Sequence, residues 1–147
     1  MKYYSLGNCA FNTKPMWRNL FTKRLVPLTG APSVRRLKTY SAQSGYVYQY
    51  FYEGQRPWQD GKEHGTEFVF TVSADRKTTH ELSVIVSASA LVDWEEQHER
   101  VLTANERYAV SKMALFQAFD DRTPERMKEA VHVHAADVGG ILDGLGL

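Results

Sequence analysis

Residues 46–52 carry an alternation that fits a β-strand rather than a helix. Tyrosine occupies every second position, and the residues between are Val47, Gln49 and Phe51. Successive side chains of a strand point to opposite faces, so the tyrosines share one face of a sheet. That row consists of Tyr46, Tyr48, Tyr50 and Tyr52. Aromatic and β-branched residues suit a pleated, half-buried surface, and the pattern therefore predicts a strand over 46–52.

The same period of two recurs on both sides of this strand. Residues 34–40 are a candidate first strand, and residues 66–73 alternate as a third. Residues 74–77 supply a turn, after which residues 78–87 complete a hairpin. Residues 53–65 are polar and contain three glycines and one proline, so we expect a loop there. The strands follow one another through turns, which predicts an antiparallel sheet.

Helical patterns take over after residue 88. Ser89 can cap a helix that continues to Val101 or Leu102. The run Thr103-Ala104-Asn105-Glu106 is a capping box, and it begins a helix with an apolar face that extends to Phe119. The run Thr123-Pro124-Glu125 is typical of another helix start, and Gly139-Gly140 would end that helix.

Strands followed by helices are typical of the α+β class. We therefore predict an antiparallel sheet of three to four strands, followed by two or three C-terminal helices packed on one face. Residues 1–33 are broken by Pro15, Pro27 and Pro32 and form a basic N-terminal arm, whereas residues 34–147 form a single α+β domain.

Basic and acidic residues are unevenly divided along the chain. Residues 1–52 contain eight Lys or Arg residues and no Asp or Glu, a charge of +8. Residues 53–147 contain the other 10 basic residues and all 17 acidic ones, a charge of −7 that leaves +1 overall. Either the basic segment folds back on the acidic body, or it meets an anionic partner such as nucleic acid or a lipid surface.

The single cysteine, Cys9, cannot form an internal disulfide, so we expect a reducing compartment and a cytoplasmic protein. The acid-free arm also matches the composition of a mitochondrial transit peptide, with a short amphipathic helix over residues 16–26. Under that alternative the protein is in the mitochondrial matrix. No apolar run approaches the roughly 18 residues of a membrane-spanning helix, so no membrane span is expected.

His132, His134 and Asp137 are candidate metal ligands, because imidazole and carboxylate groups bind transition metals together. On a helix, however, residues two apart point about 200° away from each other. Only His134 and Asp137 have a spacing that suits two ligands on one helix face, and two ligands do not make a site. We therefore expect no metal and no cofactor.

No catalytic motif is present. The sequence has no G-x-S-x-G turn and no glycine-rich phosphate loop. The acid pairs Glu95-Glu96 and Asp120-Asp121 are adjacent in sequence, so their side chains diverge on a helix instead of facing each other. An enzyme is accordingly not the expected class.

The binding candidates are the tyrosine row and the basic residues that precede it, with Trp58 as a further aromatic in the polar loop. The row and its basic neighbours, Arg35, Arg36 and Lys38, resemble the aromatic and cationic surface on which single-stranded nucleic acid stacks. A row of tyrosines can equally lie beneath a helix with the phenol tips near water. The sequence does not decide which sheet face the helices cover.

These features lead to two hypotheses. The first is a small non-enzymatic binding or regulatory domain that acts through protein–protein interaction, with a protein partner or a second copy of itself. The alternative is an RNA- or single-stranded nucleic-acid-binding module that uses the basic and tyrosine-rich strand pair.

Overall fold

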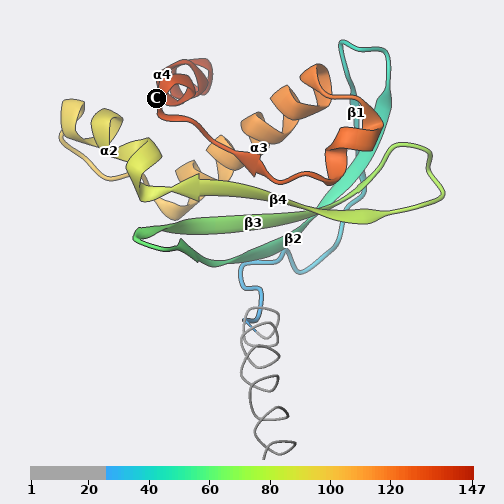
Figure 1. Ribbon diagram of the computed structural model, residues 1–147, viewed down its shortest axis with the longest axis horizontal. Coiled ribbons are helices and arrows are strands. Elements are labelled where there is room, and N and C mark those ends of the chain that lie inside the picture. Colours follow the sequence, from blue (N-terminus) through green and yellow to red (C-terminus); the bar gives the residue numbers. More distant parts are fainter. Residues whose placement is uncertain (1–25) are drawn as a thin grey trace, which may run out of the picture.

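The computed structural model describes residues 26–147, which form an α+β fold. Its sheet is five-stranded, curled and mostly antiparallel, with the order β1-β2-β3-β4-β5. The helices lie together on one side of this sheet (Figure 1). The strands are β1 (Lys38–Ser41), β2 (Val47–Asp60), β3 (Glu63–Ser73), β4 (His80–Ser87) and β5 (Val131–His132). The helices are α2 (Ala88–Gln97), α3 (Ala104–Asp121), the short 3-10 helix η1 (Pro124–Lys128) and α4 (Ala135–Gly144).

The helices cover the face of the sheet that carries the tyrosine row. Tyr48 is fully buried and Tyr50 is 5% exposed, and both contact the ring of Phe119 on α3. From β3, Phe68 and Phe70 enter the same core with no exposed surface. Each aromatic side chain removes a large apolar area from water, so this layer between sheet and α3 dominates the packing.

The expectation of three to four strands is wrong, because the sheet has five. The expected loop over 53–65 is part of the long β2–β3 hairpin, whose pairing extends to Asp60↔Glu63 around a tight turn at Gly61. A bulge between Tyr52 and Gly54 shifts the register and lets the strand continue. Polar residues occupy both faces of this distal part, so its apolar alternation is lost although its pairing is not.

The segment after α3 also differs from the expected helix. Residues 124–128 form η1, and β5 then pairs in parallel with β4, where Val84 lies opposite Val131. Val131 and Val133 are buried and alternate with exposed histidines, which is a strand pattern. Helix α4 runs through Gly139 and Gly140 instead of ending there.

Helix α3 begins at the predicted place. The Thr103 side chain accepts from the backbone N–H of Glu106 at 3.2 Å, and the Glu106 carboxylate accepts from the N–H of Thr103 at 2.9 Å. The predicted capping box is therefore confirmed, and its helix extends to Asp121. Helix α2 is capped by Ser87 instead of Ser89, and it ends at Gln97.

Strand β1 is shorter than expected, because residues 34–37 do not pair with β2. The predicted arm as far as residue 25, with Cys9 and most of the expected helix of residues 16–26, lies outside the described residues. The division into arm and domain stays a prediction. In residues 26–147, every helix is too short or too polar to cross a membrane.

Candidate binding site at the edge of the sheet

The outer edge of β1 is an unpaired sheet edge. Among residues 26–147, β2 is the only strand that pairs with β1. Residues 33–39 are all exposed, and the apolar side chains of Val34 and Leu37 are 61% and 58% exposed. A row of free backbone N–H and C=O groups at such an edge can pair with another strand.

The ladder shows which backbone groups of β1 are free. The N–H of Ala42 donates to the carbonyl of Tyr46 at 2.8 Å, and the same register continues as Tyr40↔Tyr48 and Lys38↔Tyr50. In an antiparallel pair the backbone groups of alternate residues face opposite sides of the strand. Therefore the N–H and C=O groups of Thr39 and Ser41 face the open edge.

The structure separates the three predicted cations between the two faces of this edge. The Arg35 guanidinium lies 4.0 Å from the centre of the Phe51 ring, and its Nη2 is 2.9 Å from Oε2 of Glu53. Those partners belong to the sheet face opposite the helices. Arg36 and Lys38 instead line a hollow on the helix side. Both faces of the edge thus carry positive charge.

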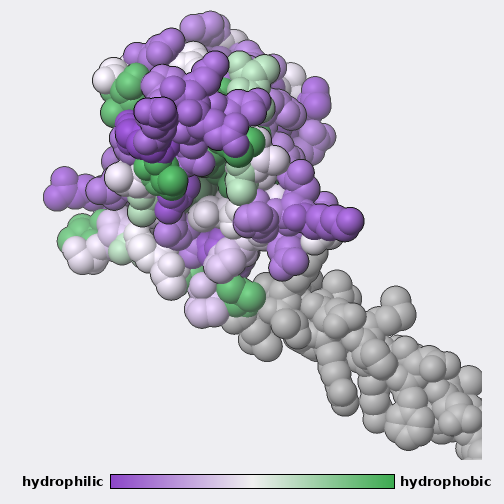
Figure 2. All heavy atoms as spheres, turned by 90° about the vertical axis from the view of Figure 1, so that its left-hand side faces the viewer, coloured by the Kyte–Doolittle hydropathy of each residue, from purple (hydrophilic) through white to green (hydrophobic). Residues whose placement is uncertain are grey.

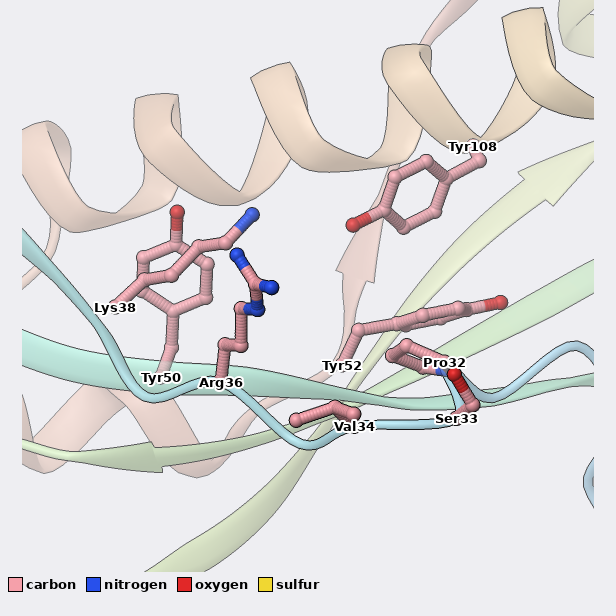
Figure 3. A pocket seen from close by; sticks show the side chains of 8 residues that line it. All are labelled: Pro32, Ser33, Val34, Arg36, Lys38, Tyr50, Tyr52 and Tyr108. Carbon is pink, nitrogen blue, oxygen red and sulfur yellow. The ribbon is translucent and has the colours of Figure 1, made fainter.

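The hollow forms where the chain leaves the edge of β2. Thr29 exchanges two backbone hydrogen bonds of 2.8 Å with Gln55, and residues 30–37 then run outward before β1 begins. The close approach of Thr29 needs Gly54, because a Cβ there would lie 2.9 Å from the Thr29 carbonyl oxygen. The resulting cavity of about 300 Å³ lies between this segment and α3 (Figure 3). It is lined by Pro32, Ser33, Val34, Arg36, Lys38, Tyr50, Tyr52 and Tyr108.

Positive charge collects at this hollow. Lys112 on α3 lies beside Lys38, and burial together with that neighbouring ammonium group lowers the pKa of Lys112. Within residues 26–147, none of Arg36, Lys38 and Lys112 forms an ion pair with a carboxylate. Three cationic side chains therefore meet without an acidic partner in the described part of the chain.

The tyrosines of the hollow supply neutral hydroxyl groups. Burial raises the pKa of Tyr50 and Tyr108, and burial with the nearby Tyr108 raises the pKa of Tyr52 to about 12. All three phenols are consequently protonated at neutral pH and can donate hydrogen bonds.

The predicted tyrosine row does not form one open surface. Tyr48 and Tyr50 are buried under α3, Tyr52 is half-buried at the hollow, and Tyr46 is 44% exposed beyond the helix. Bases stack on aromatic faces that are open to solvent, which Tyr48 and Tyr50 do not offer.

Trp58 lies apart from these residues, on the sheet face opposite the helices. Its ring centre is 6.1 Å from that of His132, and both side chains line an open groove with the ion pair of Arg56 and Glu67. The ion pair of Arg56 and Glu67 was not predicted, because residues 53–65 were expected to form a loop. In the structure Arg56 and Glu67 are opposite each other in the β2–β3 register.

The candidate metal ligands come near one another without forming a site. His132, His134 and Asp137 line a small hollow beside α3, with His132 on β5 and Asp137 in the first turn of α4. In the described residues, no three His, Cys, Asp or Glu side chains are grouped closely enough to hold a metal ion.

Tyr108 and Lys112 are the site residues that sequence reasoning did not identify. They are four residues apart on α3 and so lie on one face of that helix. The spacing is visible in the sequence, but nothing in the sequence shows that this face of α3 lies against the edge of the sheet.

Among the described residues, the face that carries α2 differs from this edge. The face that carries α2 is mostly hydrophilic, with small and separate hydrophobic groups (Figure 2). Two exposed apolar residues are Val92 on α2 and Val101 in the loop that follows α2. No protein family, curated protein or solved structure matches this chain. Its function is therefore argued from geometry and charge.

Proposed function

We propose that this protein is a small non-enzymatic domain that binds another protein, and that an extended acidic segment of the partner adds to the open edge of β1. The observation that carries the proposal is the unpaired edge of β1, with Arg36 and Lys38 on the face of the edge that lies toward the helices. Addition of a strand supplies affinity through main-chain hydrogen bonds, and alternate side chains supply specificity.

Charge favours an acidic partner. Side chains of an added strand alternate between the two sheet faces, so acidic residues on one face would meet Arg36 and Lys38. On the other face Arg35 already pairs with Glu53, so apolar side chains suit that face better, next to Phe51. Opposite charges also accelerate association and disfavour unsuitable partners.

Geometry favours protein over single-stranded nucleic acid. Two tyrosines of the predicted stacking row lie under α3. The three cations that the sequence singled out are divided between two faces, since Arg35 lies on the face opposite Arg36 and Lys38. A nucleic-acid site needs open aromatic faces next to a continuous basic track. A strand edge needs only backbone groups, which Thr39 and Ser41 provide.

The test uses a synthetic peptide in which Glu and Val alternate, titrated calorimetrically into the full chain. Thr39→Pro removes an edge-facing N–H without removing a bond to β2, and proline is tolerated on an edge strand. Thr39→Ala keeps that N–H and is the matched control. We expect Thr39→Pro to abolish peptide binding and Thr39→Ala to retain it, with both variants folded.

Two outcomes would contradict the proposal. The first is equal binding of the acidic peptide to the parent and to Thr39→Pro. The second is tighter binding of an oligouridylate than of the peptide, with an affinity that falls steeply as salt is added. That second result would favour the nucleic-acid alternative.

A further inference from the structure

We propose that the hollow between residues 32–38 and α3 is a binding site for a phosphate monoester. This site shares Arg36 and Lys38 with the strand edge, but its polar groups are side chains that point toward α3, whereas an added strand binds the backbone groups of Thr39 and Ser41. The inference does not depend on the proposed function.

The cationic groups converge inside the hollow. Arg36 and Lys38 both line the hollow, and their side chains extend from the β1 side toward α3 (Figure 3). The hydroxyl of Tyr108 points toward the same place from α3 (Figure 3). Lys112 brings a third positive charge next to Lys38. Two cations and a neutral hydroxyl donor thus line the hollow, and a third cation lies beside Lys38.

This charge arrangement is costly without an anion. The ammonium groups of Lys38 and Lys112 repel each other, and the partial burial of Lys112 strengthens that repulsion because less water surrounds its ammonium group. Within residues 26–147 no carboxylate pairs with them or with Arg36. A bound anion would offset the repulsion, which is why the cluster indicates a ligand more than a solvated surface.

The number and type of donors favour a phosphate monoester over a carboxylate. A phosphate monoester carries a charge of about −1.5 to −2 at neutral pH and has three strong acceptor oxygens. Arginine binds two of those oxygens in a bidentate manner, and lysine binds as a point charge. A carboxylate brings a single charge to three cations.

The remaining walls suit the organic part of the ester. The rings of Tyr52 and Tyr108 are in contact, with centres 4.6 Å apart, and Pro32 and Val34 also line the hollow. The volume of about 300 Å³ is that of a small ligand pocket. The ester can be a free small molecule or a phosphorylated side chain of a partner protein, since both present the same chemistry.

The test is calorimetric titration of the full chain with phenyl phosphate, with benzoate as the singly charged comparison. We expect phenyl phosphate to bind at least about tenfold more tightly than benzoate, which corresponds to about 1.4 kcal/mol. Arg36→Met and Lys112→Met should each weaken phenyl phosphate binding by about tenfold or more. The matched control is Arg35→Met, which removes the neighbouring cation on the opposite face and should leave binding unchanged.

Thermal melting separates loss of the site from loss of the fold. Lys112→Met removes the repulsion with Lys38, so its melting temperature should equal or exceed that of the parent, and Lys112→Gln is a second variant with the same expectation. Thr39→Pro should still bind phenyl phosphate, so failure of the strand-edge proposal would not affect this result.

A peptide that contains phosphotyrosine distinguishes a phosphorylated partner protein from a free small molecule as the source of the phosphate ester. Tighter binding of that peptide than of phenyl phosphate would assign the ester to a partner protein, and equal or weaker binding would assign it to a small molecule. Equal affinity of phenyl phosphate for the parent, Arg36→Met and Lys112→Met would overturn the proposal, as would benzoate binding as tightly as phenyl phosphate.

Discussion

Tyr48 and Phe119 stack face to face, with ring centres 4.4 Å apart and ring planes 10° from parallel. This contact fixes the start of β2 against the last turn of α3, and neither side chain is exposed. We therefore expect Tyr48→Ala to lower the free energy of unfolding by about 3–5 kcal/mol, because it leaves a cavity between sheet and helix. Urea denaturation measures this loss. A change below about 1 kcal/mol would show that the stack is not part of the core.

Removal of the Tyr48 hydroxyl alone should stabilise the protein. This hydroxyl is buried and has no hydrogen-bond partner among the described residues. A buried polar group without a partner costs about 1–3 kcal/mol, so Tyr48→Phe should raise the free energy of unfolding by about 1 kcal/mol. Destabilisation of Tyr48→Phe in the same urea assay would mean that the hydroxyl has a partner.

Gly54 should tolerate no side chain. Its φ is +135°, and a Cβ would lie 2.9 Å from the carbonyl oxygen of Thr29. Gly54→Ala should cost about 1–3 kcal/mol in thermal or urea unfolding. The matched control is Gly139→Ala in α4, where no atom lies within 4 Å of the added Cβ. Gly139→Ala should raise the free energy of unfolding by about 0.5–1 kcal/mol, because alanine has the higher helix propensity. Equal effects of the two substitutions would contradict the close approach of Thr29 to Gly54.

The face of α3 can be tested at two adjacent positions. Phe116 stacks on Tyr40 with ring centres 4.5 Å apart, whereas Gln117 is exposed. Because Phe116 is only partly buried, Phe116→Ala should cost about 3 kcal/mol, the low end for a buried aromatic residue. Gln117→Ala should change the free energy of unfolding by less than about 0.5 kcal/mol. Similar losses of unfolding free energy in the two variants would mean that α3 turns a different face toward the sheet.

Alkaline unfolding should depend on Tyr52. Burial raises its pKa to about 12 in the folded state, from about 10 in the unfolded chain. The unfolded state therefore loses this proton first, so the stabilisation is complete below about pH 10 and is lost as the pH rises toward 12. Tyr52→Phe should lose less stability than the parent across that range in urea titrations. Identical pH profiles for Tyr52→Phe and the parent would contradict the burial of Tyr52.

The sequence predicted those elements whose signal is local. The alternation of residues 46–52 and 66–73 indicated strands, and the Thr103–Glu106 capping box located the start of α3. The end of the β2–β3 hairpin was missed because its residues are polar on both faces, so only cross-strand pairing reveals it. Strand β5 was missed because it has two residues and depends on β4 for its pairing.

The candidate site was predictable in part. Arg36, Lys38, Tyr50 and Tyr52 were all singled out, and they line one hollow. Arg35 and Arg36 lie on opposite faces of the edge, as adjacent residues of an extended chain do, so their separation could have been deduced from the sequence. The contribution of Lys112 could not have been deduced from the sequence, because only the packing of α3 against the sheet brings Lys112 beside Lys38.

Residue-resolved amide hydrogen exchange tests the strand-edge proposal most directly. In the described chain the N–H groups of Thr39 and Ser41 face the open edge, so they should exchange rapidly in the free protein. Addition of the alternating Glu and Val peptide should slow exchange at both positions, because each N–H then donates to the added strand. Exchange at Thr39 and Ser41 that stays rapid while the peptide is bound would contradict the proposal that partners add to the edge of β1.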